Sequence, residues 1–318
     1  MDRRNFLKTA GILSSAAWMM NRAAGFSFAS ASAPKQFKVG VISDGLSQDF
    51  EAALKILKSY DVRWVEIRKV WNTYNTEATP EQIRRLKELL EQYQIRCSQV
   101  DTALYKCSLP GSKTLGAGTP VYPYDQQMDL LKRAIERAHA WGTDKVRIFA
   151  FWRVADPAAI FHRVSDEIHK AAEVAKSAGI RLTIENEDST NVGTVQELTR
   201  MLAVLPSNVG ANYDIGNGLW LGEVPYPDGY QRLDPKRIWN MHLKGVQCGP
   251  SFKDCKETFA GAGQIDLKGQ LTALLRDGYE GTMSLECEFR DPNLTQLETT
   301  TRSLDELLNV MAQAIAER

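Results

Sequence analysis

The chain has no surplus of charge of either sign. Its 39 lysine and arginine residues balance 39 aspartate and glutamate residues, and no basic or acidic tail stands out. A protein that holds nucleic acid through its phosphates needs a basic excess to neutralise them. Nucleic acid is therefore not expected as a partner of this chain.

Cysteine is scarce as well. The five cysteines are odd in number, and no two of them form a CxxC pair. This spacing argues against a zinc ribbon and against a dense disulfide framework. Cys248 and Cys255 are near enough in sequence to pair within one loop, so a single disulfide stays open as an alternative.

No hydrophobic run is long enough to cross a bilayer, which takes about 20 apolar residues. The apolar stretch from Thr9 to Met20 is shorter, follows Arg3-Arg4 and precedes Ala29-Ser30-Ala31. This order resembles the twin-arginine export signal of bacteria. We therefore predict a signal peptide over residues 1–33 and a periplasmic or secreted protein without membrane contact after its removal. An ordinary secretion signal or an uncleaved anchor is the alternative.

The rest of the chain alternates short apolar segments with amphipathic ones. Alternation of this kind predicts parallel strands joined by crossover helices. No glycine-rich phosphate turn follows the first strand, which favours a closed barrel over an open doubly wound sheet. The sequence predicts an α/β protein with a single (β/α)8 TIM barrel over residues 34–318. The eight strands are expected to begin at Lys38, Val62, Ile95, Lys145, Arg181, Val209, Ile238 and Thr282.

Helix boundaries are marked by capping residues. Thr79-Pro80 opens one predicted helix, and Asp156-Pro157 opens another that ends at Gly179. Thr194 with Glu197 forms a capping box for a third. The irregular stretches near residues 106–124 and 245–263 are predicted to be loops. In a barrel, loops that follow strands lie on the catalytic face.

The last four predicted strands carry polar residues at every second position. In a strand, alternate side chains point to opposite faces. The apolar set can face the helices, so the polar set must face the barrel axis. That set comprises Thr183 and Glu185, Asn212 and Asp214, Asn240, His242 and Lys244, and Ser284, Glu286 and Glu288.

Because these polar positions face the barrel axis, four of them are expected to meet near the strand ends: Glu185, Asp214, His242 and Glu286. Three carboxylates in a water-poor cavity repel one another unless a cation lies between them. Oxygen ligands with one imidazole suit one divalent ion, Mn2+ first, with Mg2+, Co2+ or Zn2+ as alternatives. Taken singly, each of the four could instead be a helix cap or an ion-pair partner.

Other polar and aromatic candidates have two interpretations each. Lys244 could stabilise an oxyanion or pair with a ligand carboxylate. Trp71, Trp152 and Trp220 fall at or after strand ends, where an indole could stack on a sugar or simply pack. The remaining histidines, His139, His162 and His169, lie in predicted helices and are expected to be surface or packing residues.

At these residues the sequence resembles the sugar phosphate isomerase/epimerase family of xylose-isomerase-like barrels, over about residues 38–310. The resemblance implies that Glu185, Asp214, His242 and Glu286 are metal ligands, and that Glu185 and Glu286 also move protons. Many relatives carry histidine where this chain has Glu187 and Asn217. The motifs that carry the resemblance are Ile184-Glu185-Asn186, Asp214-Ile215-Gly216-Asn217, His242-Leu243-Lys244, Gly261-Ala262-Gly263-Gln264-Ile265-Asp266 and Ser284-Leu285-Glu286.

The expected function is that of a metal-dependent isomerase or epimerase. It would transfer a proton beside the carbonyl of a free sugar, keto-sugar or cyclitol, because export separates it from cytoplasmic sugar phosphates. Lys244, Asn217, Glu187 and Trp71 are expected to bind this carbohydrate, and a homo-oligomer is compatible with the sequence. The alternatives are a lyase acting on a 3-keto-glycoside and a non-catalytic periplasmic sugar-binding protein. A barrel nuclease of the endonuclease IV type would need many histidine ligands, and the chain has four histidines.

Overall fold

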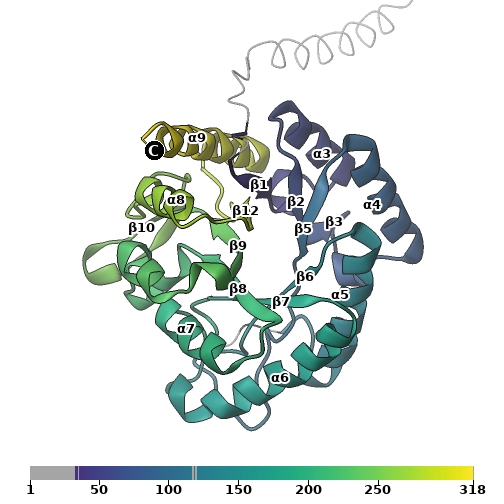
Figure 1. Cartoon of the computed structure of the whole chain (residues 1–318), viewed down its shortest axis with the longest axis vertical. Coiled ribbons are helices and arrows are strands. Elements are labelled where there is room, and N and C mark those ends of the chain that lie inside the picture. Colours follow the sequence, from purple (N-terminus) through teal and green to yellow (C-terminus); the bar gives the residue numbers. More distant parts are fainter. Residues whose placement is uncertain (1–32, 35, 117, 119, 318) are drawn as a thin grey trace, which may run out of the picture. The chain divides into compact units, whose positions relative to one another are not determined.

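Eight parallel strands form the centre of the molecule in the computed structural model, which describes residues 33–34, 36–116, 118 and 120–317. Around the sheet they follow the order β1-β12-β9-β8-β7-β6-β5-β2 (Figure 1). The strands are β1 (Lys38–Val41), β2 (Trp64–Ile67), β5 (Arg96–Val100), β6 (Lys145–Ile148), β7 (Arg181–Glu185), β8 (Val209–Asp214), β9 (Ile238–Leu243) and β12 (Thr282–Leu285).

The two ends of this sheet meet at β1 and β2. A single parallel bridge between Ile42 and Glu66 joins them, so the barrel is nearly closed. Each predicted strand contains an observed one, with starts that agree within two residues. The predicted α/β barrel is therefore confirmed for the part of the chain that the structure describes.

Helices form an outer layer around the strands (Figure 1). One prediction about them was wrong, because β8 is followed by short turns over residues 217–237 and by no α-helix among the described residues. Gly218, Gly222, Pro225 and Pro227 interrupt this stretch, and both residue types disfavour helix interiors. The helices are α2 (Ser43–Leu46), α3 (Phe50–Ser59), α4 (Pro80–Tyr93), α5 (Gln127–Trp141), α6 (Phe161–Ser177), α7 (Val195–Val204), α8 (Leu267–Arg276) and α9 (Gln296–Ala316).

The predicted helix starts are confirmed by their capping contacts. The Thr79 hydroxyl accepts a hydrogen bond from the Gln82 backbone, and the Gln82 side chain accepts one in return at the start of α4. Thr194 and Glu197 make the same reciprocal pair at α7. Asp156 caps a short 3-10 turn that leads into α6.

Two small hairpins lie after strand ends, and the second of them falls in a stretch that was predicted to be a loop. β3 (Lys69–Val70) pairs with β4 (Thr73–Tyr74), and β10 (Gly245–Gln247) pairs with β11 (Lys256–Thr258). A disulfide between Cys248 and Cys255 closes the second hairpin. The disulfide that the sequence left open is thus present, and Cys97, Cys107 and Cys287 are free and buried.

The inside of the barrel is polar. Thr183, Asn212, Asn240, His242 and Ser284 have no exposed surface, as the alternation along their strands predicts. Most of them are hydrogen-bonded to one another or to a residue of an earlier strand, as Thr183 is to Gln99 of β5. These bonds offset the cost of burying polar groups. Such an interior can hold charged groups near the strand ends.

The predicted signal peptide lies, but for Ala33, outside the described residues, and it stays a prediction. Among the residues described, no helix is both long and apolar enough to span a membrane.

Candidate metal centre

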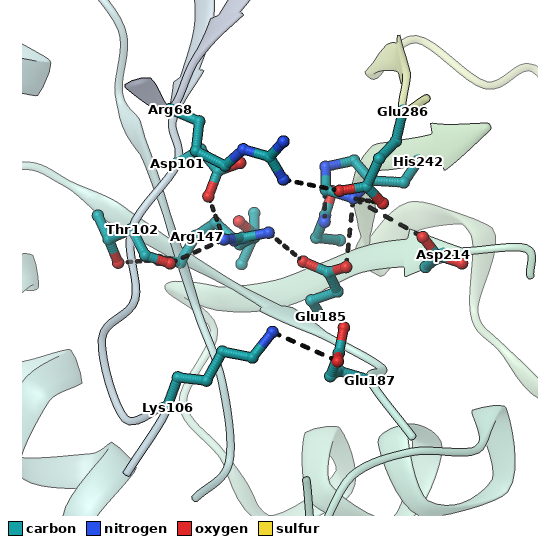
Figure 2. A network of polar contacts seen from close by, with 12 residues as sticks. Arg68, Asp101, Thr102, Lys106, Arg147, Glu185, Glu187, Asp214, His242 and Glu286 are labelled. Carbon is teal, nitrogen blue, oxygen red and sulfur yellow. Dashed lines mark hydrogen bonds and ion pairs between the residues drawn. The ribbon is translucent and has the colours of Figure 1, made fainter. Parts of the chain in front are cut away.

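Four side chains converge at the carboxyl ends of neighbouring strands. Glu185 ends β7, Asp214 ends β8, His242 lies on β9, and Glu286 follows β12. Each offers one ligand atom, and these atoms all lie within 4.8 Å of one another. All four are buried, and Figure 2 shows them facing a common point.

The histidine is held in one orientation. His242 Nε2 lies 2.9 Å from Glu66 Oε1, on β2, so Nδ1 is the nitrogen that faces the cluster. Nδ1 lies 3.3 Å from Glu185 Oε1, 3.4 Å from Glu286 Oε2 and 3.8 Å from Asp214 Oδ2. A histidine whose second nitrogen contacts a carboxylate is the usual arrangement at metal sites.

The aspartate is fixed in a similar way. Its Oδ1 atom accepts hydrogen bonds from the backbone N–H groups of Gly216 and Asn217, at 2.7 and 2.8 Å. That leaves Oδ2 directed at His242 and at Lys244. The donor set is one imidazole nitrogen and three carboxylate oxygens, which fits a divalent ion.

Three cations, the buried Lys244 and Arg147 and the partly exposed Arg68, balance these carboxylates. Lys244 Nζ lies 2.9 Å from Asp214 Oδ2 and 2.6 Å from Glu286 Oε2. Of its two predicted roles, pairing with a ligand carboxylate is the one that the structure shows. Arg147 is 2.6 Å from Glu185 Oε2 and also pairs with Asp101 (Figure 2). Arg68 Nη1 lies 3.3 Å from Glu286 Oε1.

These contacts set the charge of the cluster. Burial alone would raise the pKa of Glu286, but Lys244 and His242 hold it well below its usual range. For Glu185, Arg147 and His242 outweigh burial and lower the pKa to about 2. Burial opposes charge on His242, yet the carboxylates of Glu66, Glu185 and Glu286 raise its pKa well above the ordinary value. The imidazole therefore carries a proton that a metal ion would displace.

A cavity of about 160 Å³ adjoins the cluster. Glu185 and Glu286 both contribute to its wall, together with the cations that hold them. The cavity is lined by Arg68, Lys69, Tyr74, Ala103, Lys106, Arg147, Phe149, Glu185, Glu187, Glu286 and Glu288.

Three of the four residues predicted to bind substrate, Lys244, Asn217 and Glu187, lie together beside Glu185, and Glu187 is the one of them that lines the cavity. Asn217 Nδ2 is 3.3 Å from Glu187 Oε2 and 3.4 Å from Glu185 Oε1, and its side-chain oxygen accepts a hydrogen bond from Lys244. Trp71 is not among the residues that line the cavity, where Tyr74 of the same hairpin is found. A substrate role for Trp71 stays a prediction.

Sequence reasoning missed the contribution of the first four strands. Glu66, Arg147 and Asp101 are buried at the centre of the network, and Lys106 lies 3.3 Å from Glu187. A signal for two of them was present, because Glu66 and Arg147 each stand between apolar neighbours within a buried strand. Burial of such a residue requires a partner of opposite charge.

The chain is thus a nearly closed parallel (β/α)8 barrel with a buried Glu-Asp-His-Glu cluster at its carboxyl end that could hold a metal ion. Residues 54–308 match the family model of the xylose isomerase-like TIM barrel, and the chain belongs to that family.

Two curated relatives match part of the chain. The rhizopine catabolism protein MocC of Rhizobium meliloti is 28% identical over 161 residues, or 46% of this chain and 48% of that protein. The inosose dehydratase of Lacticaseibacillus casei is 25% identical over 146 residues, or 42% of this chain and 48% of the relative. The aligned region thus spans about half the length of these relatives.

Solved structures share the fold over most of the chain. The IOLI protein with a binding zinc atom has a TM-score of 0.70 at 18% identity, covering 87% of this chain and 99% of that one. L-ribulose 3-epimerase has a TM-score of 0.63 at 16% identity, covering 88% and 96%. At such identities the likeness concerns the fold.

Proposed function

We propose that the protein is a divalent-metal-dependent sugar isomerase or epimerase. Its substrate would be a free sugar, keto-sugar or cyclitol, from which it removes a proton beside the carbonyl. One observation carries the proposal: Glu185 and Glu286, on strands separated by β8 and β9, line the same cavity and lie beside the same histidine.

Glu185, Asp214, His242 and Glu286 would hold the ion, with Mn2+ as the first candidate and Mg2+, Co2+ or Zn2+ as alternatives. Bound there, such an ion supplies positive charge for the oxygens of an enediolate. The compact donor set and the fixed Nδ1 of His242 support this assignment.

The proton transfer itself would fall to Glu185 and Glu286, one as base and the other as acid. Their separation on the barrel allows them to reach opposite faces of a bound sugar. Return of the proton to the opposite face gives an epimer, and return to the neighbouring carbon gives an isomer. Arg147 and Arg68 would keep the two carboxylates in place.

The cavity supports a neutral polyhydroxylated substrate. Three of the four cations in its wall, Arg68, Arg147 and Lys106, are each paired with a carboxylate, which leaves them little capacity for a phosphate group. The fourth, Lys69, lies over the Tyr74 ring. Asn217, Glu187 and Lys244 provide hydrogen-bonding groups for hydroxyls close to Glu185.

A lyase is the second candidate, and a specific pair of residues favours it. Glu187 is a partly buried carboxyl whose pKa is raised by burial, an effect that Lys106, 3.3 Å away at the cavity wall, only partly opposes. A protonated carboxyl there could donate a proton to a departing hydroxyl or alkoxide. The same enediolate would then lose its β-substituent, from a 3-keto-glycoside or a cyclitol ketone. The inosose dehydratase among the relatives is consistent with this chemistry.

We also propose export to the periplasm or beyond by the twin-arginine route. The Cys248–Cys255 disulfide supports it, because disulfides persist mainly in oxidising compartments.

The proposal is tested by incubating the Mn2+-loaded protein with keto-sugars, inososes and 3-keto-glycosides in D2O. Exchange of a C–H proton with formation of an epimer or isomer would support the first function. Exchange with loss of a β-substituent would identify the lyase. Saturable binding without exchange across the whole panel would contradict both and indicate a sugar-binding protein.

A further inference from the structure

A second and larger cavity opens at the opposite end of the barrel, where the strands begin. Its volume is about 870 Å³, within the range of small-molecule sites. The first residues of β1, β6, β7, β9 and β12 contribute to it, so it is distinct from the cavity beside the metal centre. In barrel enzymes this face normally serves stability, and catalysis takes place at the other.

Lys145 is the most unusual residue of this cavity. Its side chain is 6% exposed, and its Nζ donates to the Trp239 carbonyl at 3.1 Å and to the Thr282 hydroxyl at 2.7 Å. No carboxylate of the described chain lies within ion-pair distance of it. A buried ammonium without a counter-charge is costly, and burial lowers the pKa of Lys145 to about 8.

The remaining charges of the lining leave the cavity positive. Lys38 and Lys236 also have no ion-pair partner among the described residues. Two of the three acidic residues are already engaged, since Asp144 pairs with Arg181 at 2.7 Å and Asp277 pairs with Arg276 at 2.9 Å. An anion in this cavity would therefore face more lysines without an ion-pair partner than carboxylates without one.

Two indole rings complete the lining. Trp64 and Trp239 are partly exposed there, at the starts of β2 and β9. Arginine side chains lie over both rings, Arg96 at 5.6 Å from Trp64 and Arg181 at 4.7 Å from Trp239. Each arginine covers one face of its indole, and the exposed remainder of the ring is where the ring of a ligand could pack.

We propose that this cavity binds a small organic acid that carries its carboxylate on a ring, a sugar acid or an aromatic acid. The carboxylate would contact Lys145, and the ring would lie against Trp64 or Trp239. The site lies at the other end of the barrel from the metal centre, and this proposal does not depend on the function proposed there.

A chain of hydrogen bonds shows how deep the lysine is set into the barrel. From Lys145 it passes to Thr282, whose hydroxyl donates to Asn240 Oδ1 at 2.5 Å. Asn240 Nδ2 in turn donates to Glu66 Oε2 at 3.1 Å, and Glu66 contacts His242. The groups deeper in the barrel than Lys145 thus already have hydrogen-bond partners, and a ligand would contact Lys145 from the cavity side.

The test is isothermal titration of the full protein with D-glucuronate and benzoate, and with the neutral analogues D-glucose and benzyl alcohol. At least one acid should bind saturably, and more tightly than its neutral analogue. Lys145→Met should weaken this binding by about ten-fold or more, as expected for loss of a charge-assisted contact. The matched control, Lys106→Met at the other end of the barrel, should change it by less than about two-fold.

Trp239→Leu provides a second variant in case Lys145→Met does not fold, and it should also weaken binding. A crystal of the wild-type protein with the acid should place the ligand against the indoles. The proposal is overturned if neither acid binds saturably, if acids and neutral analogues bind equally, or if Lys106→Met costs as much as Lys145→Met. Binding of glucuronate alone would specify a sugar acid, and binding of benzoate alone an aromatic acid.

Discussion

Glu66 and His242 face each other across the barrel axis, with 2.9 Å between Oε1 and Nε2. Both side chains are fully buried, and they come from the second and seventh strands of the barrel in chain order. This contact points the other nitrogen of the histidine at three carboxylates. Glu66 is outside the four-residue cluster, yet this contact lets it set the orientation of His242 in the candidate metal centre.

Replacing that carboxylate should weaken metal binding although Glu66 is no ligand. In Glu66→Gln we expect Mn2+ affinity to fall by about 10- to 100-fold, the usual cost of losing an outer partner of a ligating histidine. Titration calorimetry on the metal-free protein measures it. The control is Glu77→Gln, an exposed carboxylate paired with Arg133. Equal affinities of the two variants would show that Glu66 does not orient His242.

Metal binding should release a proton. The raised pKa of His242 means that the folded, metal-free protein keeps this proton at neutral pH, whereas an unfolded chain, near 6.5, mostly does not. Its contribution to stability is full below about pH 6.5 and is lost as the pH rises through the raised value. Because a metal needs the neutral imidazole, Mn2+ affinity should increase with pH.

Calorimetry in buffers of different ionisation enthalpy counts the protons released. A heat of binding that is the same in every buffer would mean that His242 is neutral before the metal arrives.

The state of the cysteines should report the route of export. Protein recovered from the periplasm should show three titratable thiols after denaturation, since Cys248 and Cys255 are bonded. Replacing Arg3 and Arg4 with Lys should retain the protein in the cytoplasm, where all five of its cysteines would be reduced. Export of the Lys-Lys variant at the normal level would refute the twin-arginine route.

Glu286→Gln separates proton transfer from metal binding. With the site saturated by Mn2+ and its occupancy measured, we expect solvent-deuterium exchange to fall by about 10²- to 10⁴-fold. Glu77→Gln is the matched control, because that exposed carboxylate pairs with Arg133 and does not line the cavity. Near-normal exchange in fully loaded Glu286→Gln would reduce Glu286 to a ligand.

The sequence was most informative for strands in which polar and apolar residues alternate. Glu185 and His242 could be assigned to the barrel axis because their apolar neighbours must face the helices. Arg68 and Lys106 could not be placed in this way, since they lie beyond the ends of β2 and β5, where no periodicity constrains a loop. The β10–β11 hairpin escaped prediction for the same reason.

Ion pairs between strands, neighbouring or distant, were also beyond the sequence. The contact of Arg147 with Glu185 joins β6 to β7, and that of Glu66 with His242 crosses the barrel. Single charged residues in buried strands indicate that a partner exists. They do not say which strand provides it, because that depends on how the barrel closes.

The most direct test of the metal centre is the metal content of three proteins, each loaded with Mn2+, freed of excess ion and analysed by mass spectrometry. The wild type and His139→Ala should retain one equivalent per chain, since His139 lies on α5 and contacts the Ala178 carbonyl. His242→Ala should retain only a small fraction, because it loses the single nitrogen ligand of the cluster. Equal metal content in His242→Ala and His139→Ala, whether both keep the ion or both lose it, would contradict the site described here.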